Sequence, residues 1–453
     1  MITPTIKFGS RNDSLRYCLH GTSRQSRFRR SRLQSGLKHN LPRTLVIIPV
    51  LLLLVRISLF VKGHVDNAFG YVDSYAIVEI CLVGATILLL LRDAATGPVL
   101  RAVVRAPVGW LLLYYVFATL TALWSLMPIY TLFRGVEVLA QFLAVFVILA
   151  HARGFAAREF TFLAAAAVAI VLEIAGIARL SGGIDSIDSI HTCSYSNVGL
   201  MLFAYCLAEY PGCEPPRRRT LLWFGLIGLA AIVVGTSATT NLAAVVGILI
   251  AVIISVRRSS LQPITVVAIC LLLLLGVMAL LARDSIIALL MPNKTAEEIQ
   301  SFSGRRQLWE YLSLSGALRE SPLLGLGFVA STRAGDLAVY NAHNALLQAL
   351  LDTGLLGTGI LVLALVALAV SCIRQLKQRS AGSPGFAAAF AALLPVNVTV
   401  PIWGVGWEKS VLAWAFLVGL YTLSSRQWNP RPSPLQTAAM RRGPLRLGLI
   451  GRQ

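Results

Sequence analysis

The sequence predicts an all-α integral membrane protein with about 12 transmembrane helices and one large external loop. Three observations lead to this prediction. Hydrophobic residues make up 56% of the 453 residues, only 13% are charged, and the apolar residues occur in long uninterrupted runs. A soluble domain has roughly a quarter of its residues charged, and a run of about 20 apolar residues can cross a bilayer as a helix. The runs are too long for the core helices of a soluble protein.

The apolar segments long enough to be membrane spans are 44–61, 74–92, 107–126, 131–150, 159–179, 197–209, 220–237, 239–256, 263–282, 354–372, 385–403 and 408–424. The weakest is 197–209, because it is short and needs residues from its flanks. The chain then divides into a basic tail at 1–43, spans at 44–282, an external loop at 283–353, spans at 354–424 and a basic tail at 425–453.

The charge pattern predicts the orientation of these spans. The formal net charge is +20, which by itself could indicate a nucleic-acid partner. Lys and Arg lie between the apolar runs, however, and not along one helix face. Loops rich in Arg alternate with loops that carry Asp, as the positive-inside rule requires. We therefore expect both termini in the cytoplasm, membrane lipids as surroundings, and no nucleic acid.

The sequence contains seven Cys residues but no CxxC pair, no metal-ligand spacing and no Walker loop. It also lacks paired carboxylates at glycosidase spacing. We therefore predict neither a metal ion nor a cofactor.

The external loop and its flanks contain three motifs, SGRRQLW at 303–309, PLLGLG at 322–327 and HNALLQALLDTGLLG at 343–357. In this order they resemble the signature loop of the O-antigen ligases and the O-antigen and exopolysaccharide polymerases, the Wzy-type membrane proteins. LWSLMPIYTLFRGVEVL at 123–139 resembles the junction between the third and fourth spans of that family. The glycines at 354, 357 and 359 are interpreted as a small-residue run for helix packing.

This resemblance implies a fold similar to the C-type membrane glycosyltransferases. It also implies transfer of a glycan from undecaprenyl diphosphate to an acceptor sugar on the periplasmic face of the bacterial inner membrane. The acceptor would be lipid A-core for a ligase in lipopolysaccharide biosynthesis, or a lipid-linked repeat unit for a polymerase of O-antigen or exopolysaccharide.

Two residues are the predicted catalytic groups. The diphosphate leaving group gains negative charge as the glycosidic bond breaks, and the planar guanidinium of Arg305 suits that charge. An imidazole ordinarily titrates near neutral pH, so His343 could take the proton of the acceptor hydroxyl. Asn344 could orient that imidazole, contact substrate or cap the following helix.

Weaker substrate-binding candidates are Arg179, at the outer end of the fifth span, and Thr239 and Asn241, in the turn GTSATTNLAAVV at 235–246. The resembling ligases place an Arg in this turn, and some polymerases a Lys, whereas this chain has only uncharged polar residues there. Arg134 and Glu137 lie three residues apart in the fourth span and could pair on one helix face.

The alternative function is a transporter or flippase of lipid-linked oligosaccharide, which would also have many spans. Such proteins usually contain internal repeats, and none is visible in this sequence. The unusual residues are concentrated in one external loop, which favours an external active site.

Overall fold

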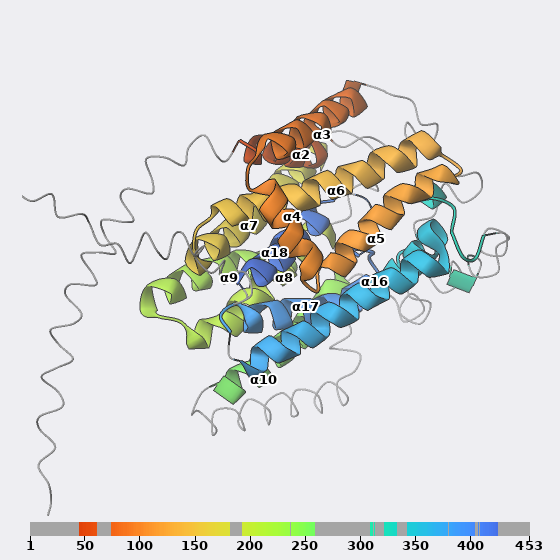
Figure 1. Ribbon diagram of the computed structural model, residues 1–453. Helices are drawn as coiled ribbons and strands as arrows, with labels where there is room; N and C mark the ends of the chain where they lie inside the picture. Colours follow the sequence, from red (N-terminus) through yellow and green to blue (C-terminus); the bar gives the residue numbers. More distant parts are fainter. Residues whose placement is uncertain are drawn as a thin grey trace, which may run out of the picture.

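The computed structural model describes residues 45–60, 74–181, 193–235, 237–258, 309–310, 312, 321–332, 342–378, 380–403, 406 and 408–424. All regular secondary structure in these ranges is helical, which confirms the predicted all-α fold (Figure 1). Long α-helices are joined there by turns and by three short 3-10 segments, Thr121–Leu123 (η3), Tyr210–Gly212 (η5) and Ala330–Thr332 (η6).

The helices coincide with the predicted apolar segments. They are α2 (Ile47–Leu59), α3 (Ser74–Arg92), α5 (Gly109–Leu120), α6 (Pro128–His151), α7 (Phe155–Ser181), α8 (Cys193–Glu209), α9 (Pro215–Gly235), α10 (Ala238–Arg258), α16 (Ala345–Lys377), α17 (Ser383–Asn397) and α18 (Lys409–Ser424). By length and composition, 5 of the described helices could cross a membrane, or up to 6 if one bent pair is a single span. The total of about twelve spans remains a prediction, and the segment 263–282 lies outside the described residues.

The weakest predicted span, α8, lies at the centre of the bundle. It gains its missing length from the residues before 197 and packs against α7, α9, α10, α17 and α18. Leu200, Met201, Leu202, Ala204 and Tyr205 are fully buried. A helix that is apolar all round is expected to be buried in this way, and the surrounding protein explains why α8 needs less apolar length than a lipid-facing helix.

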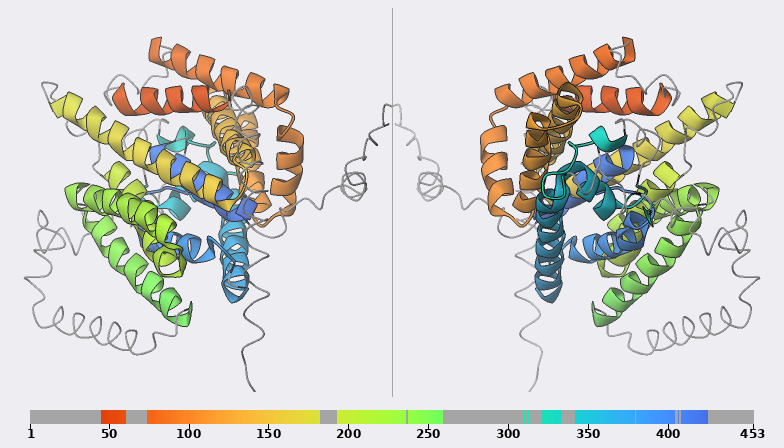
Figure 2. Two further views of the ribbon diagram at one scale, coloured as in Figure 1. Left: turned by 90° about the vertical axis from the view of Figure 1, so that its left-hand side faces the viewer. Right: turned by 90° about the vertical axis from the view of Figure 1, so that its right-hand side faces the viewer.

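Close helix contacts depend on small residues. A Cβ atom on Gly199 of α8 would lie 2.7 Å from the carbonyl oxygen of Gly228 on α9, so glycines allow these helices to touch. The views from two sides show α9 and α10 across the bundle from α2 and α3, with α17 and α18 between them (Figure 2).

One helix, α4 (Thr96–Arg105), was not predicted, because the sequence shows only an Arg-containing connection there. This short helix meets the helical segment Gly109–Leu123 at an angle of 104°. Pro107 explains the bend, because a proline disfavours helical backbone at the preceding residue, and Ala106 has a ψ of 163°.

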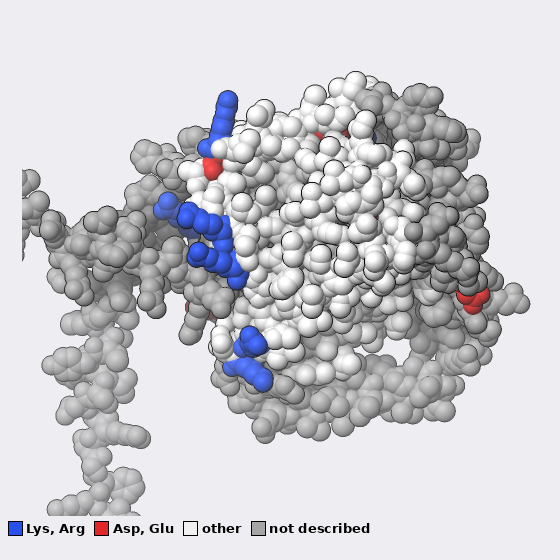
Figure 3. All heavy atoms as spheres, turned by 45° about the vertical axis from the view of Figure 1, so that its right-hand side comes forward, with Lys and Arg blue, Asp and Glu red and all other residues white. Residues whose placement is uncertain are grey.

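Lys and Arg gather at one end of the bundle. Figure 3 shows them along one edge of a face that otherwise carries almost no charge among its described residues. The exposed cations of the helix connections are Arg92, Arg101, Arg105, Arg153, Arg218, Arg219, Arg374 and Lys377. This distribution fits the predicted orientation, in which that end would face the cytoplasm.

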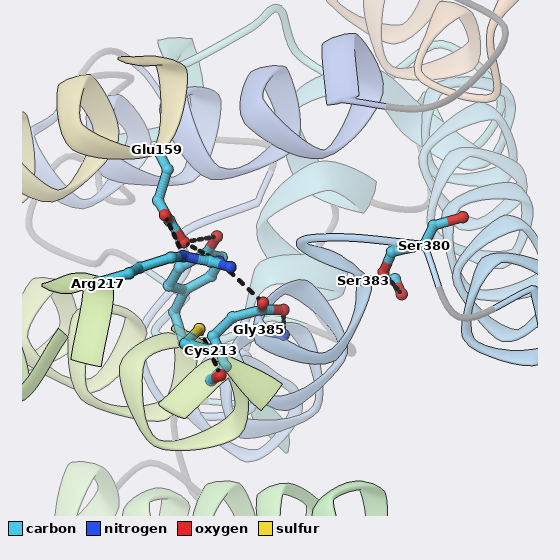
Figure 4. Close-up of polar contacts among 8 residues, drawn as sticks. Glu159, Cys213, Arg217, Ser380, Ser383 and Gly385 are labelled. Atoms are coloured by element: carbon cyan, nitrogen blue, oxygen red, sulfur yellow. Dashed lines mark hydrogen bonds and ion pairs between the residues drawn. The ribbon is translucent and has the colours of Figure 1, made fainter. Parts of the chain in front are cut away.

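A network of ion pairs, which we call the Arg217 brace, joins four helices at the same end (Figure 4). Arg217 of α9 donates to Glu159 of α7, with Nε and Oε2 2.7 Å apart, and to Glu209 of α8, with Nη2 and Oε2 3.0 Å apart. Glu209 also accepts the backbone N–H of Gly385 in the first turn of α17, at 3.0 Å. The Tyr205 hydroxyl donates to Glu159 at 2.8 Å. Both carboxylates are almost fully buried.

Candidate functional site

Three of the sequence motifs meet at the end of the bundle opposite the Arg217 brace. They are PLLGLG, the HNALLQALLDTGLLG motif that begins α16, and the junction before α6. The segment 321–328 lies against the start of α16, where the N–H of Leu326 donates to the carbonyl of Leu351 at 2.8 Å and that of Gly327 to Asp352 at 2.9 Å. On its other side, the N–H of Leu126, from the junction before α6, donates to the carbonyl of Leu326 at 3.1 Å. PLLGLG is therefore bonded on both sides by backbone groups of the other two motifs.

Side chains of the junction complete this contact. Thr121 accepts the backbone N–H of Phe328 at 2.9 Å, and the hydroxyl of Thr131 donates to the carbonyl of Phe328 at 3.2 Å. Trp124 donates its indole N–H to the carbonyl of Leu324 at 3.1 Å. The Phe328 ring is fully buried, so the segment is both packed and hydrogen-bonded.

Glycines are required at three of these contacts. Gly325, Gly327 and Gly354 have φ angles of 71°, 107° and 64°, a region that glycine occupies at little cost. A Cβ atom would lie 2.0 Å from the Ser125 hydroxyl at Gly327, and 2.3 Å from the Leu323 carbonyl at Gly354. Packing was the predicted role of the glycines in α16. Gly354 and Gly357 meet close neighbours, whereas a Cβ at Gly359 would have nothing within 4 Å.

A buried carboxylate ties this segment to α16. Asp352 is fully buried and accepts the hydroxyl of Ser331 and the side-chain amide of Gln348, the latter at 2.9 Å. Backbone N–H groups of Val329 and Ser331 also donate to it. Val329 has a φ of 61°, which is unusual for a β-branched residue and is held there by these bonds.

His343 has the second strained backbone, with a φ of 50°. Ala342 before it is fixed on both sides, because its N–H donates to Gln348 at 3.0 Å and its carbonyl accepts the Trp309 indole N–H at 2.7 Å. Asn344 after it caps α16, accepting the N–H groups of Leu346 and Leu347 at 3.0 Å each. The partly exposed His343 is thus held at the mouth of α16. Strained residues of this kind concentrate at functional sites.

The predicted catalytic Arg305 lies outside the described residues. Its motif nevertheless reaches the site, because Trp309 of SGRRQLW is the residue that bonds Ala342.

The predicted binding residues Thr239 and Asn241 lie in the first turn of α10, partly exposed. Ser237 begins this turn and its carbonyl accepts the N–H of Asn241 at 2.9 Å. The neighbouring Thr240 is buried and donates to the Asn197 side chain of α8 at 3.0 Å. The turn is thus fixed against α8, at the same end of the bundle as His343. Arg179 belongs to α7, and its side chain is outside the described residues.

The predicted pairing of Arg134 with Glu137 is confirmed, at 2.7 Å, and it is part of a larger cluster. Arg134 also pairs with Glu79 of α3, and Glu79 pairs with Arg56 of α2 at 3.3 Å. Neither Arg56 nor Glu79 was predicted to belong to such a cluster. The partners are distant in the chain, so no local spacing signal could reveal them.

The ion pair between Lys409 and Glu173 was also not predicted from the sequence. Lys409 at the start of α18 lies 3.5 Å from Glu173 of α7, which accepts the Ser194 hydroxyl of α8 at 2.8 Å. Among the described residues no group of three or more His, Cys, Asp or Glu could hold a metal ion, and the absence of a metal stays a prediction.

Comparison with known proteins supports the resemblance drawn from the motifs. Residues 223–362 match the family model described as O-antigen ligase. The match begins in α9, includes the turn before α10 and the segment 321–328, and ends in the middle of α16. A search of the curated proteins gave no match. This match over residues 223–362 supports membership of the O-antigen ligase family.

Proposed function

We propose that this protein transfers a glycan from undecaprenyl diphosphate to an acceptor sugar on the periplasmic face of the bacterial inner membrane. Its O-antigen ligase domain supports a function of this type in polysaccharide biosynthesis. Members of the family are ligases or polymerases, which are enzymes. The lipid-linked donor, the acceptor sugar and the side of the membrane are part of the proposal.

The observation that carries the proposal is the position of His343. It occupies a strained backbone conformation between a hydrogen-bonded Ala342 and a capped α16, at the place where the motifs meet. Fixing the backbone on both sides of a residue in this way suits a catalytic group, because the residue is positioned before the substrate arrives.

In the proposed reaction, the acceptor hydroxyl oxygen attacks the anomeric carbon of the donor sugar and His343 takes the hydroxyl proton. The bond from that carbon to the diphosphate oxygen breaks, and the lipid diphosphate leaves with the bonding electron pair. Arg305 stabilises the charge that develops on the diphosphate. No nucleotide sugar is required, because the energy is stored in the diphosphate linkage.

The remaining polar residues would bind substrate. Thr239 and Asn241 offer hydrogen bonds without charge at the fixed turn before α10, and Arg179 would supply a second cation. The side-chain oxygen of Asn344 is already engaged by the helix cap. Any contact of Asn344 with sugar or phosphate would therefore come from its NH₂ group.

The test is glycan transfer by purified protein reconstituted with lipid-linked oligosaccharide. We expect His343→Ala and Arg305→Ala to abolish transfer while the melting temperature stays unchanged. His151→Ala is the matched control for His343, because His151 bonds Asp93 at 2.7 Å at the far end of α6, and it should retain transfer.

Four outcomes would be informative. Transfer to lipid A-core would identify a ligase, and transfer to a second lipid-linked repeat a polymerase. If the wild type transfers to neither acceptor but moves the lipid across the bilayer, the enzyme proposal is wrong and the flippase alternative replaces it. Equal transfer by wild type and His343→Ala would contradict the catalytic role of that residue.

A further inference from the structure

The helix α4 is built differently from the spans on either side of it. It turns sharply into α5, and the bend is fixed by a hydrogen bond from the N–H of Gly109 to the carbonyl of Ala106 at 2.8 Å. A Cβ atom at Gly109 would lie 2.5 Å from the carbonyl oxygen of Val104, so only a glycine permits this close return of the chain. α4 therefore lies across the direction of α5 at the end of the bundle that carries the exposed cations.

The helix presents three different stripes. Successive residues in an α-helix are 100° apart, so positions four apart share a face. Val99 and Val103 are buried against the protein, with exposed fractions of 1% and 0%. Leu100 and Val104 are exposed at 38% and 60%. Arg101 and Arg105 form the third stripe and are also exposed.

The Arg stripe has no acidic counterpart within the described part of the chain. α4 contains no acidic residue. The nearest one in sequence, Asp93, is engaged by the ring of His151 at 2.7 Å and by the N–H of Ala95 at 2.8 Å. Arg92, at the end of α3, adds a third exposed cation close to the helix in sequence.

We propose that α4 is a membrane-surface helix that binds anionic phospholipid headgroups through Arg101 and Arg105. Leu100 and Val104, on the adjacent stripe, enter the boundary of the acyl chains. An amphipathic helix lying in the plane of the interface needs this combination of apolar and basic stripes. If α4 faced only water, Leu100 and Val104 would be exposed to solvent beside the two cations without any apolar contact.

The test is phosphatidylglycerol binding to the purified full-length protein, measured by native mass spectrometry with phosphatidylcholine as the neutral reference lipid. Each basic residue near an anionic membrane surface contributes about a fivefold factor in affinity. We expect the double variant Arg101→Gln/Arg105→Gln to bind phosphatidylglycerol roughly 30-fold more weakly than wild type. Binding of phosphatidylcholine should not change.

The matched control is Arg218→Gln/Arg219→Gln, which removes two exposed cations from the first turn of α9. It should retain most of the phosphatidylglycerol binding. Equal loss in both double variants would show a general charge effect and overturn the proposal, as would unchanged binding in the α4 variant. If the α4 double variant does not fold, Arg101→Gln alone tests the same point through its expected loss of about fivefold.

Discussion

The loop beside His343 and the end of the bundle that carries Arg217 are held together by different interactions. At the Arg217 end, one guanidinium and two buried carboxylates join α7, α8, α9 and α17. At the His343 end, the loop 321–332 is fixed mainly by backbone hydrogen bonds, by glycines with positive φ and by the buried Asp352.

This difference indicates at which of the two places the backbone conformation is fixed most tightly. Ion pairs are tolerant of small shifts, so a charged brace holds helices together without fixing each backbone angle. Backbone hydrogen bonds beside glycines with positive φ restrict the backbone angles of the loop. They accompany the strained conformations of His343 and Val329. We therefore expect substitutions at the Arg217 end to reduce stability, and those at the His343 end to reduce activity beyond their effect on stability.

The largest expected effect on stability is that of Arg217→Ala. It leaves Glu159 and Glu209, exposed by only 4% and 3%, without their cation. Removing one partner of a buried ion pair typically costs about 3–5 kcal/mol. We expect a large drop in melting temperature in detergent, measured by intrinsic fluorescence, with glycan transfer per folded molecule retained.

The matched control for the brace is the adjacent Arg218→Ala, because Arg218 is exposed and bonds a backbone carbonyl, that of Cys213. Arg218→Ala should lower the melting temperature only slightly. If Arg217→Ala and Arg218→Ala melt at the same temperature, the brace does not stabilise the bundle as described.

The next effect is that of Gly354→Ala at the His343 end. Gly354 has φ 64° and ψ −169°, a conformation occupied essentially by glycine alone, which costs another residue about 1–3 kcal/mol. The new Cβ would also lie 2.3 Å from the Leu323 carbonyl. We expect a loss of roughly 2 kcal/mol or more and, because the start of α16 must shift, a loss of transfer greater than the loss of folded protein. Both are measured on the same reconstituted sample.

Gly359→Ala is a control in the same helix, since a Cβ there meets nothing within 4 Å. It should be neutral or stabilise α16 by up to about 1 kcal/mol, the difference in helix propensity between the two residues. Equal losses of transfer in the two variants would mean that the non-helical backbone at Gly354 has no special role.

Much of the fold could be predicted because apolar runs and Arg-bearing connections are local signals. They gave the positions of the helices, including the short α8. α4 was missed because its ten residues contain two Arg and too few apolar residues for a span. Its burial depends on packing against α5 and α6, which no window of sequence contains.

The candidate site was predictable only in part. The motifs identified His343 and Asn344 and suggested that their segments act together. The sequence could not show that Gln348, Asp352 and Ser331 form one buried network, because Ser331 lies far from the others in the chain. It also could not choose between capping and substrate contact for Asn344, since both use the same amide group.

The smallest expected effect separates those two roles of Asn344. Asn344→Ala removes the cap of α16 and should cost about 1 kcal/mol, seen as a modest drop in melting temperature. Asn344→Ser keeps an uncharged oxygen that can cap the N–H groups of Leu346 and Leu347, so it should restore most of the stability. It lacks the NH₂ group but adds no charge beside the proposed diphosphate site. If Asn344 only caps the helix, Asn344→Ser transfers glycan like wild type. If its NH₂ group binds substrate, Asn344→Ser is stable but shows a raised KM for the lipid-linked donor. That result would extend the site from His343 onto the first turn of α16.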